Sequence, residues 1–324
     1  MSGNEDGRWL AAAAALAERA RPLSRPNPGV AALVVSNGIV VGRGWTRPGG
    51  RPHAEAVALE QAGDAAHGAT LYVTLEPCAH RSERGPACAD MVVAAGVSRV
   101  VAGIADPDPR TAGRGFARLR EGGVMVACLD DDGCRASLRG YARSKTSGYP
   151  ETTLKLALTA DGFVARADGT SKWITGEAAR AHAHRERARA DAILVGGGTL
   201  RADDPALDVR LPGLEHRSPR KLLLTRHEAP EGWTAVPRPA AITGLGLQHL
   251  LVEGGAQTAA AFLAEEGLVD RLLLYRSPTV FGEGIPAFRD PAPSGAPHGW
   301  RLADRRPLGS DTLEVYTPAR NEGA

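Results

Sequence analysis

The stretch that decides the fold of the first half is Pro52-His53-Ala54-Glu55, followed by Thr74-Leu75-Glu76-Pro77-Cys78 and then by Cys88. One imidazole and two thiolates supply three of the four ligands of a tetrahedral Zn²⁺ ion. Catalytic zinc sites leave the fourth position open for water, and the metal brings the pKa of that water toward neutrality. Glu55 lies just after the histidine, where it can move a proton rather than bind the metal. The pattern predicts a catalytic zinc site.

The order of these residues is that of zinc-dependent base deaminases, in which zinc activates water and a glutamate acts as general acid and base. In those enzymes two residues usually separate the cysteines, whereas Ala79 to Ala87 separate them here. This longer loop contains His80, Arg81 and Arg84, which suit a charged substrate. A structural zinc site closed by a fourth protein ligand, or no metal at all, is the alternative interpretation.

Length and composition restrict the class of protein. A chain of 324 residues predicts two domains. The formal net charge is +2 and both signs are interspersed, so no nucleic-acid partner is expected. Two of the four cysteines, Cys128 and Cys134, lie outside the motif and are the candidates for a fourth zinc ligand. The small number of cysteines predicts a reducing compartment and so a cytoplasmic protein. No apolar run is long enough to span a membrane.

The residue pattern of the first half predicts alternating helices and strands. An Asn37-Gly38 turn joins two predicted strands, a strong hairpin signal. Helices are expected over residues 8–20, 53–61, 87–95 and 114–121 and in a segment ending near 146; strands are expected over 30–35, 39–45, 70–75, 99–104 and 124–129. Cys88 then lies in the first turn of a helix, where the helix dipole favours a thiolate. The alternation predicts a layered α/β domain.

A second α/β pattern follows a linker at Ser147-Gly148-Tyr149-Pro150, which gives domains of 1–146 and 147–324. The second pattern has strands at 152–159, 163–165, 192–195 and 249–253, a charged helix at 177–189 and a helix ending near 264. Two histidines of the charged helix, His182 and His184, are expected to be exposed. Strands 192–195 and 249–253 run directly into glycines, which suit either phosphate binding or a tight turn. Neither site has the G-x-G-x-x-G spacing of a standard dinucleotide-binding fingerprint.

Many short segments, in a fixed order over nearly the whole chain, resemble the bifunctional riboflavin-biosynthesis deaminase/reductase family. In the first half these are Arg25-Pro-Asn-Pro28, Pro52-His-Ala-Glu55, Thr74-Leu-Glu-Pro-Cys-Ala-His80, Gly85-Pro-Ala-Cys88, Asp106-Pro-Asp-Pro109 and Ala112-Gly-Arg-Gly115. In the second half they are Lys155-Leu-Ala-Leu-Thr-Ala-Asp-Gly162, Ser171-Lys-Trp-Ile-Thr175, Thr199-Leu-Arg-Ala-Asp-Asp-Pro-Ala-Leu207 and Val252-Glu-Gly-Gly255.

The resemblance implies a cytidine-deaminase-like three-layer α/β/α domain followed by a dihydrofolate-reductase-like α/β domain. It also implies two consecutive reactions on a phosphorylated pyrimidine. The first is zinc-dependent hydrolytic deamination of 2,5-diamino-6-ribosylamino-4(3H)-pyrimidinone 5′-phosphate. The second is NADPH-dependent reduction of the ribosyl group to a ribityl chain. We expect a homo-oligomer that binds neither nucleic acid nor membrane.

Site residues are carried over position by position. The resemblance makes His53, Cys78 and Cys88 the zinc ligands and Glu55 the proton carrier, and it places Asn27 and His80 near the first substrate. In the second half it implies substrate contacts for Ser171, Arg187, Asp203, Leu207, Arg210 and Glu253, and cofactor contacts for Ala157, Trp173, Thr199 and Gly255. Arg187 and Arg210 suit bidentate contacts to phosphate. Without the resemblance, Arg187 would be interpreted as a solvent-exposed charge on a helix, and Asp203 as a turn residue.

The chain also departs from the family. Thr46 stands where many members have a histidine, and the segment from about 226 to 248 is shorter than usual. The longer ligand loop suggests that Arg81 or Arg84 replaces a basic substrate contact. Thr225-Arg226-His227 replaces a serine-containing cofactor segment, so we expect Arg226 to take over the NADPH 2′-phosphate.

Three alternative functions are compatible with parts of this pattern. They are a deaminase whose degenerate second domain only dimerises or binds a ligand, a nucleic-acid deaminase, and a zinc-stabilised scaffold without activity. The intact Lys155, Asp161, Asp203, Arg210 and Glu253 count against the first alternative, and the near-neutral charge counts against the second. The open ligand set with Glu55 counts against the third.

Overall fold

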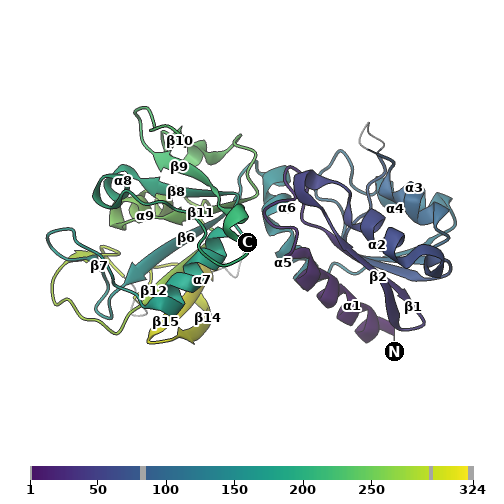
Figure 1. Ribbon diagram of the computed structural model, residues 1–324, viewed down its shortest axis with the longest axis horizontal. Coiled ribbons are helices and arrows are strands. Elements are labelled where there is room, and N and C mark those ends of the chain that lie inside the picture. The colour runs from purple at the N-terminus through teal and green to yellow at the C-terminus, as the bar shows by residue number, and fades with distance from the viewer. Residues whose placement is uncertain (1, 81–84, 292–294, 320–324) are drawn as a thin grey trace. The chain divides into compact units, whose positions relative to one another are not determined.

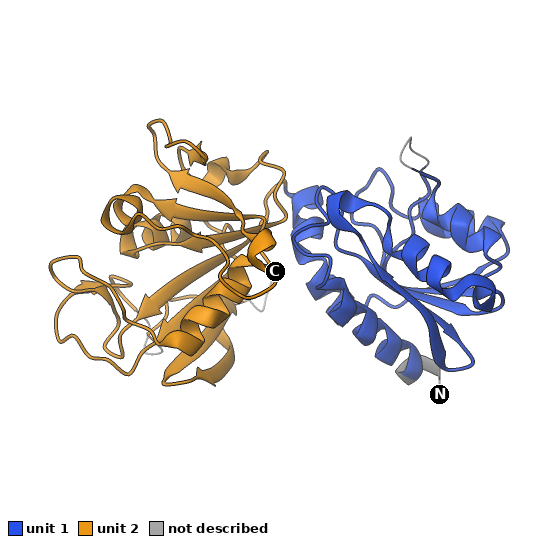
Figure 2. Ribbon diagram, viewed as in Figure 1, with its two compact units in different colours: residues 1–147 blue, residues 148–324 orange. Residues whose placement is uncertain are grey.

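The structure is a computed structural model that describes residues 2–80, 85–291 and 295–319. The chain divides into two compact units, Met1–Ser147 and Gly148–Ala324, which Figure 2 shows in blue and orange. Each unit has its own sheet and its own apolar core, and each is described by itself below.

The first unit is a five-stranded mixed sheet with helices on both faces (Figure 1). Its strands, in the spatial order β2-β1-β3-β4-β5, are β1 (Ala31–Ser36), β2 (Ile39–Trp45), β3 (Thr70–Leu75), β4 (Arg99–Ile104) and β5 (Met125–Cys128). The helices are α1 (Ser2–Ala17), α2 (Ala54–Ala62), α3 (Cys88–Ala94), α4 (Arg114–Glu121), α5 (Asp132–Ser137) and α6 (Arg139–Thr146), with short 3₁₀ turns at Pro48–Gly50 and Gly63–Ala66.

The direction of the strands follows from the connections between them. Asn37 and Gly38 have positive φ angles of 51° and 75°, so they close a tight turn and β2 pairs antiparallel to β1. β3 is antiparallel to β1, but β4 and β5 run parallel to β3 because a helix lies in each connection. The carboxyl ends of β3 and β4 therefore meet at one edge of the sheet.

The helix that carries Glu55 lies unusually close to the sheet. A methyl group at Gly42 would lie 2.1 Å from the Ala58 carbonyl oxygen, and one at Gly44 would lie 2.3 Å from the Ala54 carbonyl oxygen. These glycines alternate along β2 and so face the same side. Without side chains there, α2 packs directly on the strand backbone, which fixes the start of the helix.

The second unit is an eight-stranded sheet in the order β10-β9-β8-β11-β6-β12-β15-β14, with a separate β13-β7 ribbon (Figure 1). The strands are β6 (Glu151–Leu158), β7 (Phe163–Ala165), β8 (Ala192–Gly196), β9 (Arg220–Leu224), β10 (Trp233–Val236), β11 (His249–Glu253), β12 (Arg271–Arg276), β13 (Ile285–Pro286), β14 (Trp300–Leu308) and β15 (Asp311–Pro318). The helices are α7 (Glu177–Arg187), α8 (Gly197–Asp203) and α9 (Ala256–Leu263), with 3₁₀ turns at Glu215–Arg217 and Pro239–Ile242.

The strands of this sheet from β10 to β12 are parallel, β15 is antiparallel to β12, and β14 is antiparallel to β15. All residues of β8 and β11 are buried, as expected for parallel strands covered on both faces. Parallel pairing brings the carboxyl ends of β6, β8, β9, β11 and β12 to one edge, where ligands of open α/β sheets usually bind.

The α/β class and most predicted elements are confirmed, with boundary shifts of a few residues. One predicted helix ending near 146 is two helices, α5 and α6, because the chain turns at Leu138. No prediction was made for the strands β9, β10, β12, β14 and β15. Among the described residues, no helix is both long and apolar enough to cross a membrane.

Gly44→Ala tests the close packing of α2 on β2. The added methyl group would overlap the Ala54 carbonyl, so we expect the free energy of unfolding to fall by about 1–3 kcal/mol, as for other overpacked cores. Gly7→Ala in α1 is the control, because its methyl group meets no atom within 4 Å. That change should stabilise the protein by about 0.5–1 kcal/mol. Urea unfolding of both variants measures the effect, and equal stabilities would contradict this account of the packing.

Candidate active sites

The predicted zinc ligands come together in the first unit. His53 Nδ1 lies 3.3 Å from Cys88 Sγ and 3.6 Å from Cys78 Sγ, and one donor atom from each of the three residues lies within 4.8 Å of the others. Among the described residues, this is the sole group of three or more such side chains. An imidazole with two thiols fits Zn²⁺.

Each ligand is held by a different element. His53 caps the start of α2, Cys78 follows the carboxyl end of β3, and Cys88 is the first residue of α3. The backbone N–H of Cys88 also donates to Cys78 Sγ over 3.4 Å. Cys128 is exposed and Cys134 is buried against the Leu10 carbonyl. Neither belongs to the three-residue group, so neither supplies a fourth ligand here.

The two thiols of the group influence each other's pKa. Hydrogen bonding from the Cys88 thiol and from His53 lowers the pKa of Cys78 to about 4, even though burial acts in the opposite direction. The shared proton and burial instead raise the pKa of Cys88. Both shifts come from the contact between the two sulfurs, because the thiol that keeps its proton donates a hydrogen bond to the other sulfur.

Glu55, the predicted proton carrier, is buried at the start of α2. It is 3% exposed in the first turn of α2, and burial raises the pKa of its carboxyl above the ordinary value. Burial lowers the pKa of His53, but its hydrogen bond to Cys78 and the charge of Glu55 outweigh that effect and raise it. A carboxyl with a raised pKa accepts and holds a proton more readily than an ordinary carboxylate does, as a group that carries protons must.

The predicted contacts for the first substrate lie around these ligands. The Asn27 amide is 2.9 Å from His53 Nε2 and donates to the Gly50 carbonyl over 2.8 Å. His80 follows Cys78 closely and is exposed. Arg81 and Arg84 lie outside the described residues. The Thr46 hydroxyl is buried and accepts the Val30 N–H over 3.1 Å. Thr46, which stands where many members of the family have a histidine, therefore has a structural role.

Glu76, beside the metal ligand Cys78, was not predicted as a site residue. Its buried carboxylate accepts hydrogen bonds from several backbone N–H groups of residues 106–116. A glutamate next to a Pro-Cys pair is the signal that could have indicated it. Its partners, however, are distant in sequence and become visible only in the fold.

In the second unit, Arg187 and Glu253 form a bidentate pair. Arg187 Nε and Nη2 donate to the two Glu253 oxygens over 2.7 and 3.0 Å, and Nη1 donates to the Asp208 carbonyl over 3.1 Å. Lys155 Nζ lies 3.7 Å from the same carboxylate. Burial raises the pKa of Glu253, but Lys155 and Arg187 outweigh it and lower the pKa to about 2.

This pair changes the expected role of Arg187. Its side chain is only 17% exposed, so it is not a solvated helix charge. The Arg187 guanidinium already binds the Glu253 carboxylate with two of its nitrogens. It therefore does not present these donors to a phosphate, which is the role expected from the sequence. Arg210 is 63% exposed and pairs with Asp208 over 2.9 Å, which leaves it the better placed of the two for an anion.

Two further predicted substrate residues lie close together. The Asp203 carboxylate, at the end of α8, is 3.2 Å from Lys172 Nζ, and Lys172 follows Ser171 directly. Leu207 behaves differently, because its side chain is 3% exposed and packs in an apolar cluster with Ile193 and Leu223. Any contact of Leu207 with a ligand must come from its backbone.

Three of the four predicted cofactor residues lie at the carboxyl edge of the parallel strands. Ala157 is near the end of β6, Thr199 lies in α8 after β8, and Gly255 caps α9 after β11. Trp173 is 74% exposed, and the Arg180 guanidinium lies 5.1 Å from the centre of its ring.

The glycines at this edge have two different functions. A methyl group at Gly196 or Gly254 would lie 2.3 or 2.8 Å from Thr258 of α9, so these two glycines are needed for packing. Gly198 and Gly255 would meet no atom within 4 Å, which leaves their backbone open to a ligand. Close packing on Thr258, not a tight turn, thus accounts for the first pair, and the ligand interpretation stays a prediction for the second.

His182 and His184 are half-buried, not exposed as predicted. His182 Nδ1 lies 2.8 Å from the Tyr275 hydroxyl, and His184 Nδ1 lies 3.1 Å from the Asp208 carbonyl. Burial lowers the pKa of both imidazoles. The charged pattern of α7 concealed that one face of the helix packs against β15 of the sheet.

Comparison with known proteins supports this arrangement over the whole chain. Residues 4–104 match the family "Cytidine and deoxycytidylate deaminase zinc-binding region", and residues 150–238 and 240–313 match "RibD C-terminal domain". The riboflavin biosynthesis protein RibD of Aquifex aeolicus is 36% identical over 318 residues, which cover 86% of this chain and 89% of that protein.

Two solved structures are similar along nearly their full length. RibD of Acinetobacter baumannii is 33% identical with a TM-score of 0.85, and covers 97% of this chain and 99% of its own. The diaminohydroxyphosphoribosylaminopyrimidine deaminase/5-amino-6-(5-phosphoribosylamino)uracil reductase of Thermotoga maritima is 28% identical, with a TM-score of 0.87 and the same coverage. The chain therefore belongs to the RibD family of bifunctional riboflavin-biosynthesis enzymes, with a deaminase domain followed by a reductase domain.

Proposed function

We propose that residues 1–146 deaminate 2,5-diamino-6-ribosylamino-4(3H)-pyrimidinone 5′-phosphate, and that residues 147–324 then reduce its ribosyl group to a ribityl chain with NADPH. The observation that carries the proposal is the group His53, Cys78 and Cys88 beside the buried Glu55, in a chain of the RibD family. The intact group of Lys155, Arg187 and Glu253 favours an active second domain over a degenerate one.

In the first reaction the chain's own residues hold the substrate and move protons. Zinc bound by His53, Cys78 and Cys88 would supply a Lewis acid and an activated water. Glu55 accepts a proton from that water and returns one to the departing amine, so that ammonia leaves and oxygen takes its place on the ring. Asn27 and His80 orient the pyrimidine and its ribosyl phosphate.

In the second reaction charged side chains of the second unit orient the sugar. NADPH would supply a hydride to the ribosyl C1′. Asp203 holds a sugar hydroxyl or supports the positive charge that develops at that carbon, since a fixed carboxylate acts strongly in a partly dry site. Glu253, held by Arg187 and Lys155, accepts hydrogen bonds from the substrate, and the exposed Arg210 binds its phosphate. Ser171 and the Leu207 backbone complete the substrate contacts.

The cofactor is placed along the carboxyl edge of the sheet, next to Ala157, Trp173, Thr199 and Gly255. The edge fits a dinucleotide because the backbone at Gly198 and Gly255 is open. β9 ends at Leu224 and pairs in parallel with β8, so the exposed Arg226 follows directly at the same edge. An arginine there suits a 2′-phosphate. A cytoplasmic location and a homo-oligomeric state stay predictions.

Replacing Glu55 separates metal binding from proton transfer. Glu55→Gln should retain zinc and lose deamination by roughly 10²- to 10⁴-fold, because an amide cannot carry the proton. Cys88→Ala should instead lose the zinc itself. The control is Glu60→Gln, an exposed residue of the same helix, which should behave as the unchanged protein. Metal analysis and ammonia release measure both effects, and near-normal deamination by Glu55→Gln would exclude Glu55 as the proton carrier.

Asp203→Asn tests the electrostatic role of that carboxylate. We expect reductase turnover to fall by roughly 10²-fold or more, with little change in NADPH affinity and no change in deamination. The neighbouring Asp204→Asn is the matched control, since Asp204 ends α8 at a φ of 40° and asparagine tolerates that conformation. Both half-reactions are assayed separately for each variant. Unchanged reduction by Asp203→Asn would leave Asp203 with a structural role alone.

Arg226→Ala tests cofactor recognition independently of turnover. Loss of the guanidinium should weaken NADPH binding by roughly 10-fold and leave NADH binding almost unchanged, because the two cofactors differ in the 2′-phosphate alone. Arg301→Ala, in the edge strand β14 at the other end of the sheet, is the control. Titration by nucleotide fluorescence gives both dissociation constants. Parallel losses for NADPH and NADH would assign the 2′-phosphate to another residue.

A further inference from the structure

The carboxylate of Glu76 is surrounded by backbone donors. Its Oε2 accepts the N–H groups of Asp106 and Gly113 over 3.1 and 2.9 Å, and its Oε1 accepts those of Gly115 and Phe116 over 2.8 and 3.2 Å. The residue is 5% exposed. Four donors around one buried carboxylate form an unusually complete set, because a carboxylate has about four acceptor positions.

These contacts close a loop. Asp106 follows the end of β4 and Gly113 precedes α4, so the two ends of segment 106–113 bind the same oxygen of Glu76. Within the segment, the Asp106 carboxylate accepts the Asp108 N–H over 3.0 Å and the Thr111 hydroxyl over 2.6 Å. Glu76 thus fixes the ends of a loop whose interior is held by Asp106.

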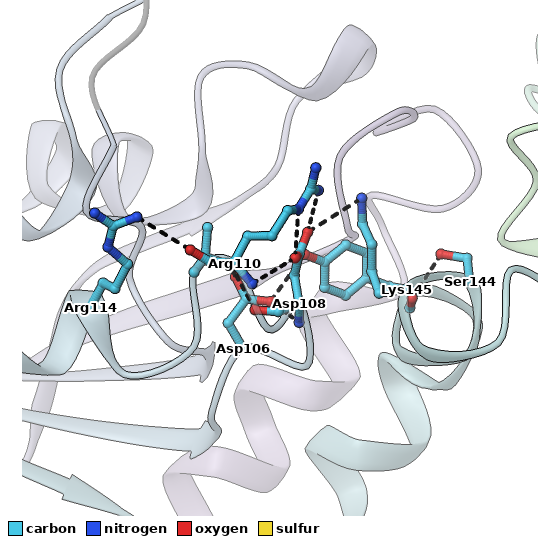
Figure 3. A network of polar contacts seen from close by, with 8 residues as sticks. Asp106, Asp108, Arg110, Arg114, Ser144 and Lys145 are labelled. Atoms are coloured by element: carbon cyan, nitrogen blue, oxygen red, sulfur yellow. Dashed lines mark hydrogen bonds and ion pairs between the residues drawn. The ribbon is translucent and has the colours of Figure 1, made fainter.

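Figure 3 shows that this loop is also tied to the last helix of the unit. The Tyr141 hydroxyl of α6 donates to Asp106 over 3.1 Å, and Lys145 Nζ lies 3.8 Å from Asp108. The Arg110 guanidinium binds Asp108 and lowers the pKa of that carboxyl. The polar side chains of the loop therefore have partners in the loop itself or in α6. Glu76 connects the loop to the sheet.

The same carboxylate belongs to the segment that carries a metal ligand. Glu76, Pro77 and Cys78 are consecutive, and the Glu76 N–H donates to the Ile104 carbonyl over 3.0 Å. A methyl group at Gly115 would lie 1.8 Å from the Pro77 carbonyl oxygen, so the loop end and the metal segment touch backbone to backbone. A shift of either segment must move the other.

We propose that Glu76 is a positioning residue of the deaminase site, which sets Cys78 and the loop of residues 106–113 at a fixed distance from each other. The inference rests on the proposed deamination. A carboxylate is required because it accepts at all its positions, whereas an amide would direct its own N–H groups at backbone donors. Residues that orient a metal ligand typically contribute roughly 10- to 100-fold to metal affinity or activity.

The test compares Glu76→Gln with Asp6→Asn in the full-length zinc-loaded protein. Asp6 is a second buried carboxylate of the same unit, which binds Arg99 over 2.8 and 2.9 Å and the Tyr72 hydroxyl over 2.8 Å, away from the metal segment. Both variants lose a buried acceptor, so both should unfold at lower temperature. Measurements are made below both unfolding transitions.

We expect Glu76→Gln to transfer zinc to a chelator roughly 10-fold faster or more and to deaminate with kcat/KM reduced by a similar factor, mostly through a higher KM. Reduction should be unchanged. Glu76→Asp keeps the charge but is shorter, and should recover part of the loss. Asp6→Asn should match the unchanged protein in zinc transfer and KM.

Two results would overturn the proposal. One is a folded Glu76→Gln protein with unchanged zinc transfer and unchanged KM. The other is an equal change in the zinc-transfer rate and KM of Asp6→Asn, because lost stability would then explain the effect of Glu76→Gln. The zinc-transfer rate does not depend on the substrate assignment. Failure of the unchanged protein to deaminate the proposed pyrimidine would thus reject the proposed function, and the role of Glu76 toward Cys78 would still be decided by the chelator measurement.

Discussion

Parallel strand pairing is the constraint on which both sites depend. In the first unit, parallel β3 and β4 end side by side, so the segment with Cys78 and the loop beginning at Asp106 emerge together. In the second unit, β6, β8, β9 and β11 end at one edge and place Ala157, Thr199 and Glu253 within one region. Residues far apart in sequence converge because parallel strands put all their carboxyl ends at the same edge.

Three buried glutamates show how partners decide the function of one side chain. Glu55 lacks a cationic partner strong enough to offset burial, so its pKa rises and it can exchange protons. Glu253 is equally buried, but Arg187 and Lys155 keep it ionised, which makes it a fixed acceptor. Glu76 has backbone N–H groups for partners and therefore organises the chain around it. Burial alone would not distinguish these three roles.

Glycine determines how closely the helices approach the sheets. Gly42 and Gly44 allow α2 to rest on β2, and this contact fixes His53 and Glu55, which lie at the start of that helix. In the second unit Gly196 and Gly254 admit Thr258 of α9 against two strand ends. In the first unit this contact is between backbones, so the helix that carries Glu55 has little freedom to move against the sheet.

The sequence by itself determined the α/β class, the hairpin at Asn37-Gly38 and the grouping of His53, Cys78 and Cys88, because these depend on local pattern and spacing. It did not reveal the pairing of Arg187 with Glu253 or the partners of His182 and His184. Nor did it reveal the four donors of Glu76. Those features depend on contacts between residues that are distant along the chain and on the depth at which each is buried. Only the tertiary structure decides both, because the energy of a charge or a hydrogen bond is set by what surrounds it.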